Sequence, residues 1–370
     1  FKSLDGTVQH NKNITVKAIL VSDKPVAVDQ VVLLRNRNEP IPVAQNGRLV
    51  LLQSEDHIFV YKLYCPVALQ RGPNAFSLQA TNASGIARAK DTPSIEYQAP
   101  ESNLYVYSIG VPLAEEGLQY SVSDAGKFGS LLRQNKEGGY FKHVESTVIT
   151  DPELTKYYKF RKILIDIRER AKLGQFKPED LLLVYVSSQS TDKVKGSLKI
   201  KASNYDGVEV ETTAVDYEDF FMYFLDDPII ICRKMLILDV FSAKPVSPGQ
   251  EEESEGEDPV TLSNTLNTLQ AQQKNLITLM ACSPNENSYE DPSWGNSALI
   301  AAMAQLFAGN NLELADTNRD KELTLNELYS FLRTRVPELL KKSGARKATT
   351  QTPFIPGFDA RKSDFTIFAY

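Results

Sequence analysis

Short runs of alternating apolar and polar residues fill the first hundred positions of the chain. β-Branched and aromatic residues are concentrated in six segments: residues 14–21, 30–34, 47–52, 59–63, 75–81 and 94–98. Turn-forming pairs separate these segments, among them Asn46-Gly47 and Gly72-Pro73. Strands of this length and spacing predict an Ig-like, all-β sandwich over residues 1–99. Such a sandwich is typical of a spacer or docking module without chemistry of its own.

The pattern changes after Pro100. Near-continuous apolar runs at residues 104–111, 145–150, 181–186, 235–240 and 276–281 predict buried strands. Helical patterns lie between and after them, at residues 122–134, 152–173, 217–225, 259–274 and 297–307. This alternation predicts a three-layer α/β domain over residues 100–370 with a mostly parallel sheet. Sites in such sheets lie beyond the carboxyl ends of the strands, here residues 187–190, 241–244 and 282–290.

Charge is unevenly distributed along the 370 residues, whose net charge is −6. Residues 251–258 contain six acids and no base, and without them the remaining 41 acidic residues equal the 41 basic ones. We therefore expect an acidic, flexible loop at residues 245–260 and no basic surface for nucleic acid. No apolar run reaches the roughly 18–20 residues that span a bilayer, so no transmembrane segment is predicted.

Cysteine and histidine are scarce, with three residues of each. These counts exclude a disulfide-rich scaffold and a Cys/His zinc module. The chain begins at Phe1 without methionine or a signal peptide. We interpret it as a mature product or as part of a longer polypeptide or complex. The compartment stays open between the cytoplasm and the periplasm or cell envelope.

Two strand-end segments carry a family resemblance. The first runs from Asp180 through an apolar strand to Ser188-Gln189-Ser190, and the second is Asp239-Val240-Phe241-Ser242. They resemble the histidine and cysteine motifs of caspase-like peptidases, the metacaspases and bacterial caspase homologues. Residues 118–125, 288–298 and 351–353 are similar to that family's first helix, late strand-to-helix loop and tail, and residues 71–98 to a sandwich that often precedes the domain. The resemblance covers residues 101–370 and implies a caspase-like fold.

The same resemblance places Gln189 at the histidine position and Phe241 at the cysteine position. Ser188 and Ser190 occupy the flanking glycine positions, and Asp239 is the acid that precedes the cysteine. A cysteine peptidase needs a thiolate nucleophile and an imidazole that activates it. Neither Gln189 nor Phe241 supplies these groups. We therefore expect a catalytically inactive pseudo-peptidase with a binding, scaffolding or regulatory role and a protein or peptide partner.

Two alternatives remain open at the level of sequence. One is an active cysteine endopeptidase with a relocated pair, for which Cys282 with His143 is the candidate; Cys232 precedes its strand and is expected at the wrong end of the sheet. The other is a structural subunit of a larger bacterial assembly. If the dyad is absent, Cys232 and Cys282 are expected to be buried thiols, and Asp239 is expected to accept hydrogen bonds from backbone amides.

Residues 316–327 follow the twelve-residue pattern of an EF-hand loop. Oxygen-bearing residues occupy the ligand positions: Asp316, Asn318, Asp320, Glu322, Thr324 and Glu327. Ca²⁺ needs six to eight oxygens, which this spacing gathers around one point. Lys321 stands where the pattern needs a glycine with positive φ. A structural Ca²⁺ and a metal-free, capped loop are both compatible with the sequence.

Overall fold

The computed structural model describes residues 6–9, 12–89, 92–98, 101–113, 120–134, 141–191, 198–241, 266–268, 276–284, 286–307, 311–343, 350–360 and 365–369. The chain divides into two compact units, Phe1–Pro100 and Glu101–Tyr370. The expected boundary lies one residue before this division. Most of the expected acidic loop and most of the expected helix at 259–274 fall outside the described residues.

The first unit contains two β-sheets. One has the strand order β2-β6-β5, and the other has the order β1-β9-β7-β3-β4 with β8 added to β7. The strands are β1 (Thr7–Gln9), β2 (Asn13–Ser22), β3 (Val31–Arg35), β4 (Glu39–Pro42), β5 (Arg48–Glu55), β6 (Ile58–Ala68), β7 (Gly72–Asn82), β8 (Gly85–Arg88) and β9 (Ser94–Tyr97). Residues from both sheets, such as Leu33, Leu63 and Phe76, share one buried cluster. This is the packing of a sandwich, in which alternate residues of each strand point inward.

The second unit is built on a seven-stranded sheet in which β11, β10, β12, β15 and β16 lie side by side and parallel. A short antiparallel extension, β13 and β14, continues from β12. The strands are β10 (Ser102–Gly110), β11 (Phe141–Ile149), β12 (Leu181–Thr191), β13 (Lys199–Lys201), β14 (Ala214–Asp216), β15 (Arg233–Phe241) and β16 (Leu276–Met280). The chain as a whole is therefore multidomain, with an all-β unit and an α/β unit.

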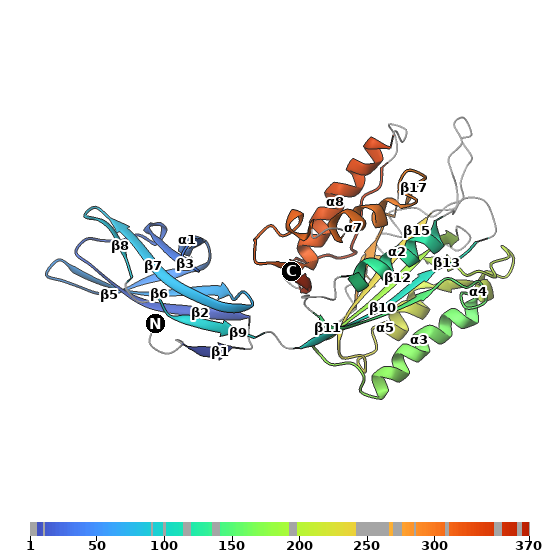
Figure 1. Ribbon diagram of the computed structural model, residues 1–370, viewed down its shortest axis with the longest axis horizontal. Coiled ribbons are helices and arrows are strands. Elements are labelled where there is room, and N and C mark those ends of the chain that lie inside the picture. The colour runs from blue at the N-terminus through green and yellow to red at the C-terminus, as the bar shows by residue number, and fades with distance from the viewer. Residues whose placement is uncertain are drawn as a thin grey trace. The chain divides into compact units, whose positions relative to one another are not determined.

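Helices cover both faces of this sheet (Figure 1). One face packs against α2 (Ser121–Gln134), α7 (Ala298–Phe307) and α8 (Leu325–Lys342), and the other against α3 (Tyr157–Lys172), the π-helical turn η2 (Tyr217–Met222) and α5 (Tyr223–Leu225). In β12, Leu183 and Tyr185 face the first group of helices, whereas Leu182 and Val184 face the second. Burial on both faces explains why the strand sequences are almost continuously apolar.

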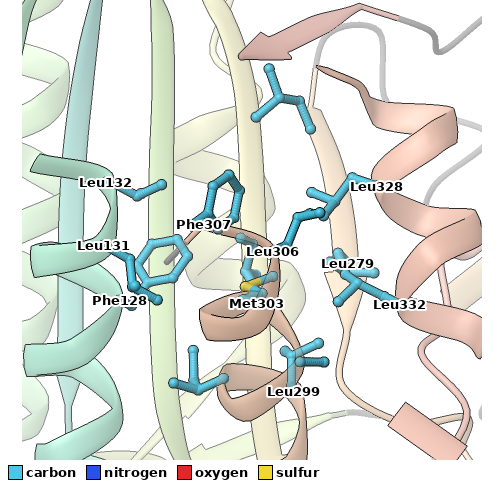
Figure 2. Packing of buried hydrophobic residues seen from close by; sticks show 14 of the residues in the cluster. Phe128, Leu131, Leu132, Leu279, Leu299, Met303, Leu306, Phe307, Leu328 and Leu332 are labelled. Carbon is cyan, nitrogen blue, oxygen red and sulfur yellow. The ribbon is translucent and has the colours of Figure 1, made fainter. Parts of the chain in front are cut away.

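The core beneath α2 and α7 is closely packed (Figure 2). Phe128 and Leu131 of α2 point toward Met303 and Phe307 of α7, and side chains of α8 lie beside Leu279 of β16. Shorter elements of the second unit are α4 (Val210–Thr213), β17 (Glu290–Asp291), β18 (Asn296–Ser297), the 3₁₀ turn η3 (Asn311–Leu314), β19 (Glu322–Thr324) and β20 (Thr366–Ala369). The first unit also contains the 3₁₀ turn η1 (Val28–Gln30) and the short helix α1 (Val43–Asn46). In the described part of the chain, no helix is long and apolar enough to cross a membrane.

Candidate site at the carboxyl ends of the sheet

Gln189 and Phe241 lie opposite one another at the ends of two adjacent parallel strands, β12 and β15. Gln189 is inside β12 rather than in the expected loop, because the strand continues to Thr191. Its amide oxygen accepts a hydrogen bond of 3.0 Å from the ammonium of Lys201 in β13. Both positions lie towards the carboxyl ends of their strands, but the sequence gave no indication that Gln189 would contact Lys201.

The neighbouring serines hold the β13 extension in place. Ser188 donates from its hydroxyl to the carbonyl oxygen of Lys201 at 2.7 Å, and Ser190 pairs with Ile200. The ammonium of Lys201 also lies 4.9 Å from the ring centre of Tyr205. In these bonds Ser188 acts as a structural donor, and Gln189 acts as an acceptor.

Asp239 is completely buried two residues before the end of β15. Its carboxylate accepts hydrogen bonds from the hydroxyls of Tyr185 at 3.1 Å, Ser288 at 2.8 Å and Ser297. These donors are side chains, whereas backbone amides were expected. Burial raises the pKa of Asp239 above its ordinary value, and the hydroxyl bonds only partly oppose that effect.

A second buried carboxylate, Asp124 in α2, lies close to Asp239. One of its oxygens accepts from Asn296 Nδ2 at 3.0 Å and from the backbone N–H of Ser297 at 2.9 Å. The other oxygen, Oδ2, is buried and has no hydrogen-bond partner among the residues that the structure describes. Burial, and then the charge of Asp239, raises the pKa of Asp124 to about 8.

Ser297 connects these two acids, since its N–H binds Asp124 while its hydroxyl binds Asp239. Two carboxylates held this close in a buried site cannot both ionise easily. The arrangement therefore favours retention of a proton by the pair near neutral pH. Asp124 lies within residues 118–125, which resemble the family's first helix, but nothing in the sequence indicated its contacts with Asn296 and Ser297.

The chain's own tail lies against the last parallel strand of this edge. Phe354 forms an antiparallel bridge with Met280, with two backbone hydrogen bonds of 2.8 and 2.9 Å. Gln351 is fully buried, donates to the carbonyl oxygen of Ala281 and the hydroxyl of Ser288, and accepts from the N–H of Tyr289. The tail segment predicted by the resemblance is thus an integral wall of the site.

The relocated catalytic pair is not assembled. Cys282 follows the carboxyl end of β16, and burial raises the pKa of its thiol far above the ordinary value. His143 is exposed and pairs with Asn103 at the amino end of the sheet. Across the sheet, Met280 of β16 is aligned through β15 and β12 with Ile109 of β10. Ile109 lies six residues beyond Asn103, the residue of β10 that pairs with His143. At about 3.3 Å per residue this corresponds to roughly 20 Å along the sheet, far beyond hydrogen-bond reach.

The other thiols also lack an activating environment. Cys232 is buried immediately before β15, at the expected amino end, and burial raises its pKa to about 12. Cys65 is buried in the sandwich, and burial raises its pKa as well. A reactive cysteine needs a depressed pKa, so all three thiols are chemically quiet.

The turn that the EF-hand pattern needs is formed in residues 316–327. Lys321 adopts the left-handed conformation with φ 63°, so the missing glycine has not prevented the turn. The carboxylates of Asp316, Asp320 and Glu327 are buried and accept hydrogen bonds from amides of the loop. The side-chain oxygen of Asn318, which is exposed, accepts a hydrogen bond from the N–H of Asp320.

Three of the six expected ligands have additional structural roles. The carboxylate of Glu322 accepts from the hydroxyl of Thr366, which ties β19 to β20, and Thr324 caps α8 together with Glu327. The oxygen donors match the preference of Ca²⁺. Within the described residues, however, no three His, Cys, Asp or Glu side chains converge closely enough to hold a metal ion.

Comparisons with known proteins do not assign a family. No family model and no curated protein matches the chain. Among solved structures, the titin domains Z1Z2 in complex with telethonin match over 29% of this chain and 56% of that chain, with 18% identity and a TM-score of 0.16. A family 123 glycoside hydrolase from Clostridium perfringens matches over 80% of this chain and 70% of that chain, with 9% identity and a TM-score of 0.15. Neither similarity is close enough to carry an argument about fold or function.

Proposed function

We propose that residues 101–370 form a caspase-like domain that has lost peptidase chemistry and that the protein acts by binding a protein or peptide partner in a scaffolding or regulatory role. The register of β12 and β15 is the observation that carries this proposal. It sets Gln189 directly opposite Phe241 at the carboxyl edge, where the resemblance expects a histidine and a cysteine.

The residue types at these two positions explain why hydrolysis is not expected. An amide cannot take up a proton near neutral pH, and a phenyl ring has no nucleophilic atom. Gln189 is also engaged with Lys201. Cys282 and His143 lie at opposite ends of the sheet, so the geometry argues against the alternative of a relocated cysteine endopeptidase.

A binding role is consistent with the way the tail is held at this edge. Residues 351–354 run beside β16 and are fixed by main-chain and side-chain hydrogen bonds. An extended segment can therefore be retained here by strand-like pairing, which is a common mode of peptide recognition. The partner would be held through this geometry without being cut.

Peptide hydrolysis tests the proposal directly. The unmodified protein should not cleave fluorogenic peptides that end in Arg, Lys or Asp above the buffer rate. The double variant Phe241→Cys with Gln189→His should show measurable cleavage, because it restores a nucleophile and a base on facing positions. The single variant Phe241→Cys, which lacks the base, is the matched control. Cleavage by the unmodified protein that disappears with Cys282→Ala would contradict the proposal.

We also propose a structural Ca²⁺ in the loop at residues 316–327, held by oxygens of Asp316, Asn318, Asp320, Glu322, Thr324 and Glu327. The support is the combination of buried carboxylates with the left-handed turn at Lys321. Burial of several carboxylates in one small loop is costly unless positive charge or hydrogen bonds compensate it. A bound cation would order the start of α8.

A further inference from the structure

One face of the sandwich has an unusual surface. The outward residues of β2, β6 and β5 form two cross-strand rows, Lys17–Tyr64–Arg48 and Ile19–Lys62–Val50. Ile19 is 57% exposed and Val50 is 38% exposed, and Val21 beside them is 64% exposed. We call this set of residues the outer face. Exposed aliphatic side chains gathered on one sheet face are typical of an interaction surface.

The edge of this sheet is open. Within the described residues β5 pairs only with β6, so its other side has no strand partner. Leu51 is 50% exposed and Leu52 is 56% exposed, and β5 contains no proline. By contrast β4, an edge strand of the other sheet, carries Pro40 and Pro42, which prevent strand addition.

The bulge at Leu52 limits where another strand could add. The pairing of β5 with β6 shifts register between Leu51 and Gln53, so the regular ladder on this side runs from Arg48 to Leu51. Inward-pointing Leu49 and Leu51 pair with Leu63 and Tyr61. Leu51 is half exposed, and within the described residues β6 is the only strand that pairs with β5 beside it.

The outer face is also positively charged. The guanidinium of Arg48 lies 4.6 Å, and the ammonium of Lys62 5.3 Å, from the ring centre of Tyr64. Among the described residues, no carboxylate forms an ion pair with Lys17, Arg48 or Lys62. Glu55 lies beyond the bulge and bonds Gln53. The face therefore offers three cations beside an apolar strand edge.

We propose that the open edge of β5 binds an extended segment of a partner protein in which apolar and acidic residues alternate. The backbone of such a segment would add to the sheet next to Arg48–Leu51. Its inward residues would cover Leu51, and its outward carboxylates would lie beside Arg48 and within the field of Lys62. Strand addition supplies affinity through the main chain, and the alternating side chains supply specificity.

Binding of two synthetic peptides to the full chain tests this proposal. One is a blocked octapeptide of alternating valine and glutamate, and the other has lysine in place of glutamate. Fluorescence anisotropy should show saturable binding of the glutamate peptide that weakens as salt is added, and no binding of the lysine peptide. Absence of binding by the glutamate peptide, or equal binding of both peptides, would overturn the proposal.

Charge reversal on the edge strand provides the decisive variant. Arg48→Glu should weaken binding of the glutamate peptide at least about tenfold and create affinity for the lysine peptide. Arg88→Glu makes the same change on β8, an exposed strand of the other sheet, and should leave both affinities unchanged. Unchanged binding to Arg48→Glu, or an equal loss in both variants, would contradict the assignment.

Other occupants of the surface give distinguishable results. Light scattering that finds a dimer which Arg48→Glu converts to a monomer would identify a second copy as the occupant and overturn the proposal. Binding to phosphatidylserine vesicles that Arg48→Glu abolishes, without peptide binding, would identify a lipid surface and overturn it equally. A further variant changes an apolar residue of the edge strand: Leu51→Asp should weaken binding of the glutamate peptide. Ile86→Asp, at an exposed residue of β8, should leave this binding unchanged.

Discussion

At the scale of single residues, the buried pair Asp124 and Asp239 governs how the site responds to pH. The pKa of Asp124 is raised from 3.8 to about 8 by burial and by the charge of Asp239. A carboxyl group whose folded pKa is raised contributes stability that is complete below pH 3.8 and is lost as pH rises through about 8. The protein should therefore become less stable between pH 5 and pH 9 on account of this group.

Asp124→Asn should reduce that loss. Asparagine keeps the oxygen that accepts from Asn296 and Ser297 while it removes the charge. At pH 9 the variant should have a higher melting temperature than the unmodified protein, by roughly 2–4 °C for each kcal/mol gained in the free energy of unfolding. At pH 5 the difference in melting temperature should be smaller or reversed. Asp291→Asn, at an exposed carboxylate with a lowered pKa, should give no alkaline gain. Melting curves that change in parallel with pH for Asp124→Asn and the unmodified protein would contradict this account.

The limit of the sequence is visible in these same residues. The position of Asp239 at a strand end followed from the apolar run before it, and the structure places it there. Its partners could not be derived in that way, because Ser288 and Ser297 lie about fifty residues further along the chain. Asp124 was missed as a site residue for the same reason. Its contact with Ser297 spans 173 positions and depends on how α2 meets the loop before α7.

At the scale of elements, the loop before α8 should respond to Ca²⁺. If the loop binds the ion, millimolar Ca²⁺ should raise the melting temperature, and a chelator should reverse the effect, because a ligand that binds only the folded state stabilises it. Glu327→Gln should abolish the shift. Glutamine keeps one acceptor oxygen for the capping box with Thr324 but has no second acceptor for the N–H of Thr317, so the metal-free variant should also be less stable. The quantity to compare is therefore the change in melting temperature that Ca²⁺ causes in each protein. Mg²⁺ at the same concentration is the control ion, and equal shifts with both ions would argue against a selective Ca²⁺ loop.

Long, strongly patterned elements were predicted better than short ones. The five core strands of the second unit and the helices α2 and α7 all lie where the apolar periodicity places them, within a few residues at their ends. The short strands β13, β14, β19 and β20 were not predicted, since three or four residues carry too little pattern. Helix α3 begins at Tyr157 rather than at residue 152, because residues 152–155 form a turn held by Asp151. Local propensity therefore predicted the existence of elements better than their ends.

At the scale of the whole molecule, Gln351 joins segments of the second unit that are far apart in sequence. It contacts Ala281, Ser288 and Tyr289, which lie 62 to 70 positions away, and it is fully buried. The resemblance indicated a tail segment here but not its partners. Closure of the sheet edge thus depends on one amide near the end of the chain.

Gln351→Ala should destabilise the second unit by about 1–3 kcal/mol, because it leaves a buried carbonyl and a buried N–H without partners. Trp294 is the only tryptophan in the chain and lies in the same unit, so its fluorescence during urea unfolding reports on this unit alone. Thr350→Ala, at the exposed neighbouring position, should change the stability by less than about 0.5 kcal/mol. Equal urea midpoints for the two variants would mean that the hydrogen bonds of Gln351 do not contribute to the stability of the second unit. A lower urea midpoint for Gln351→Ala alone would show that the tail stabilises the second unit, so a partner that binds this edge of the sheet would meet the tail in place.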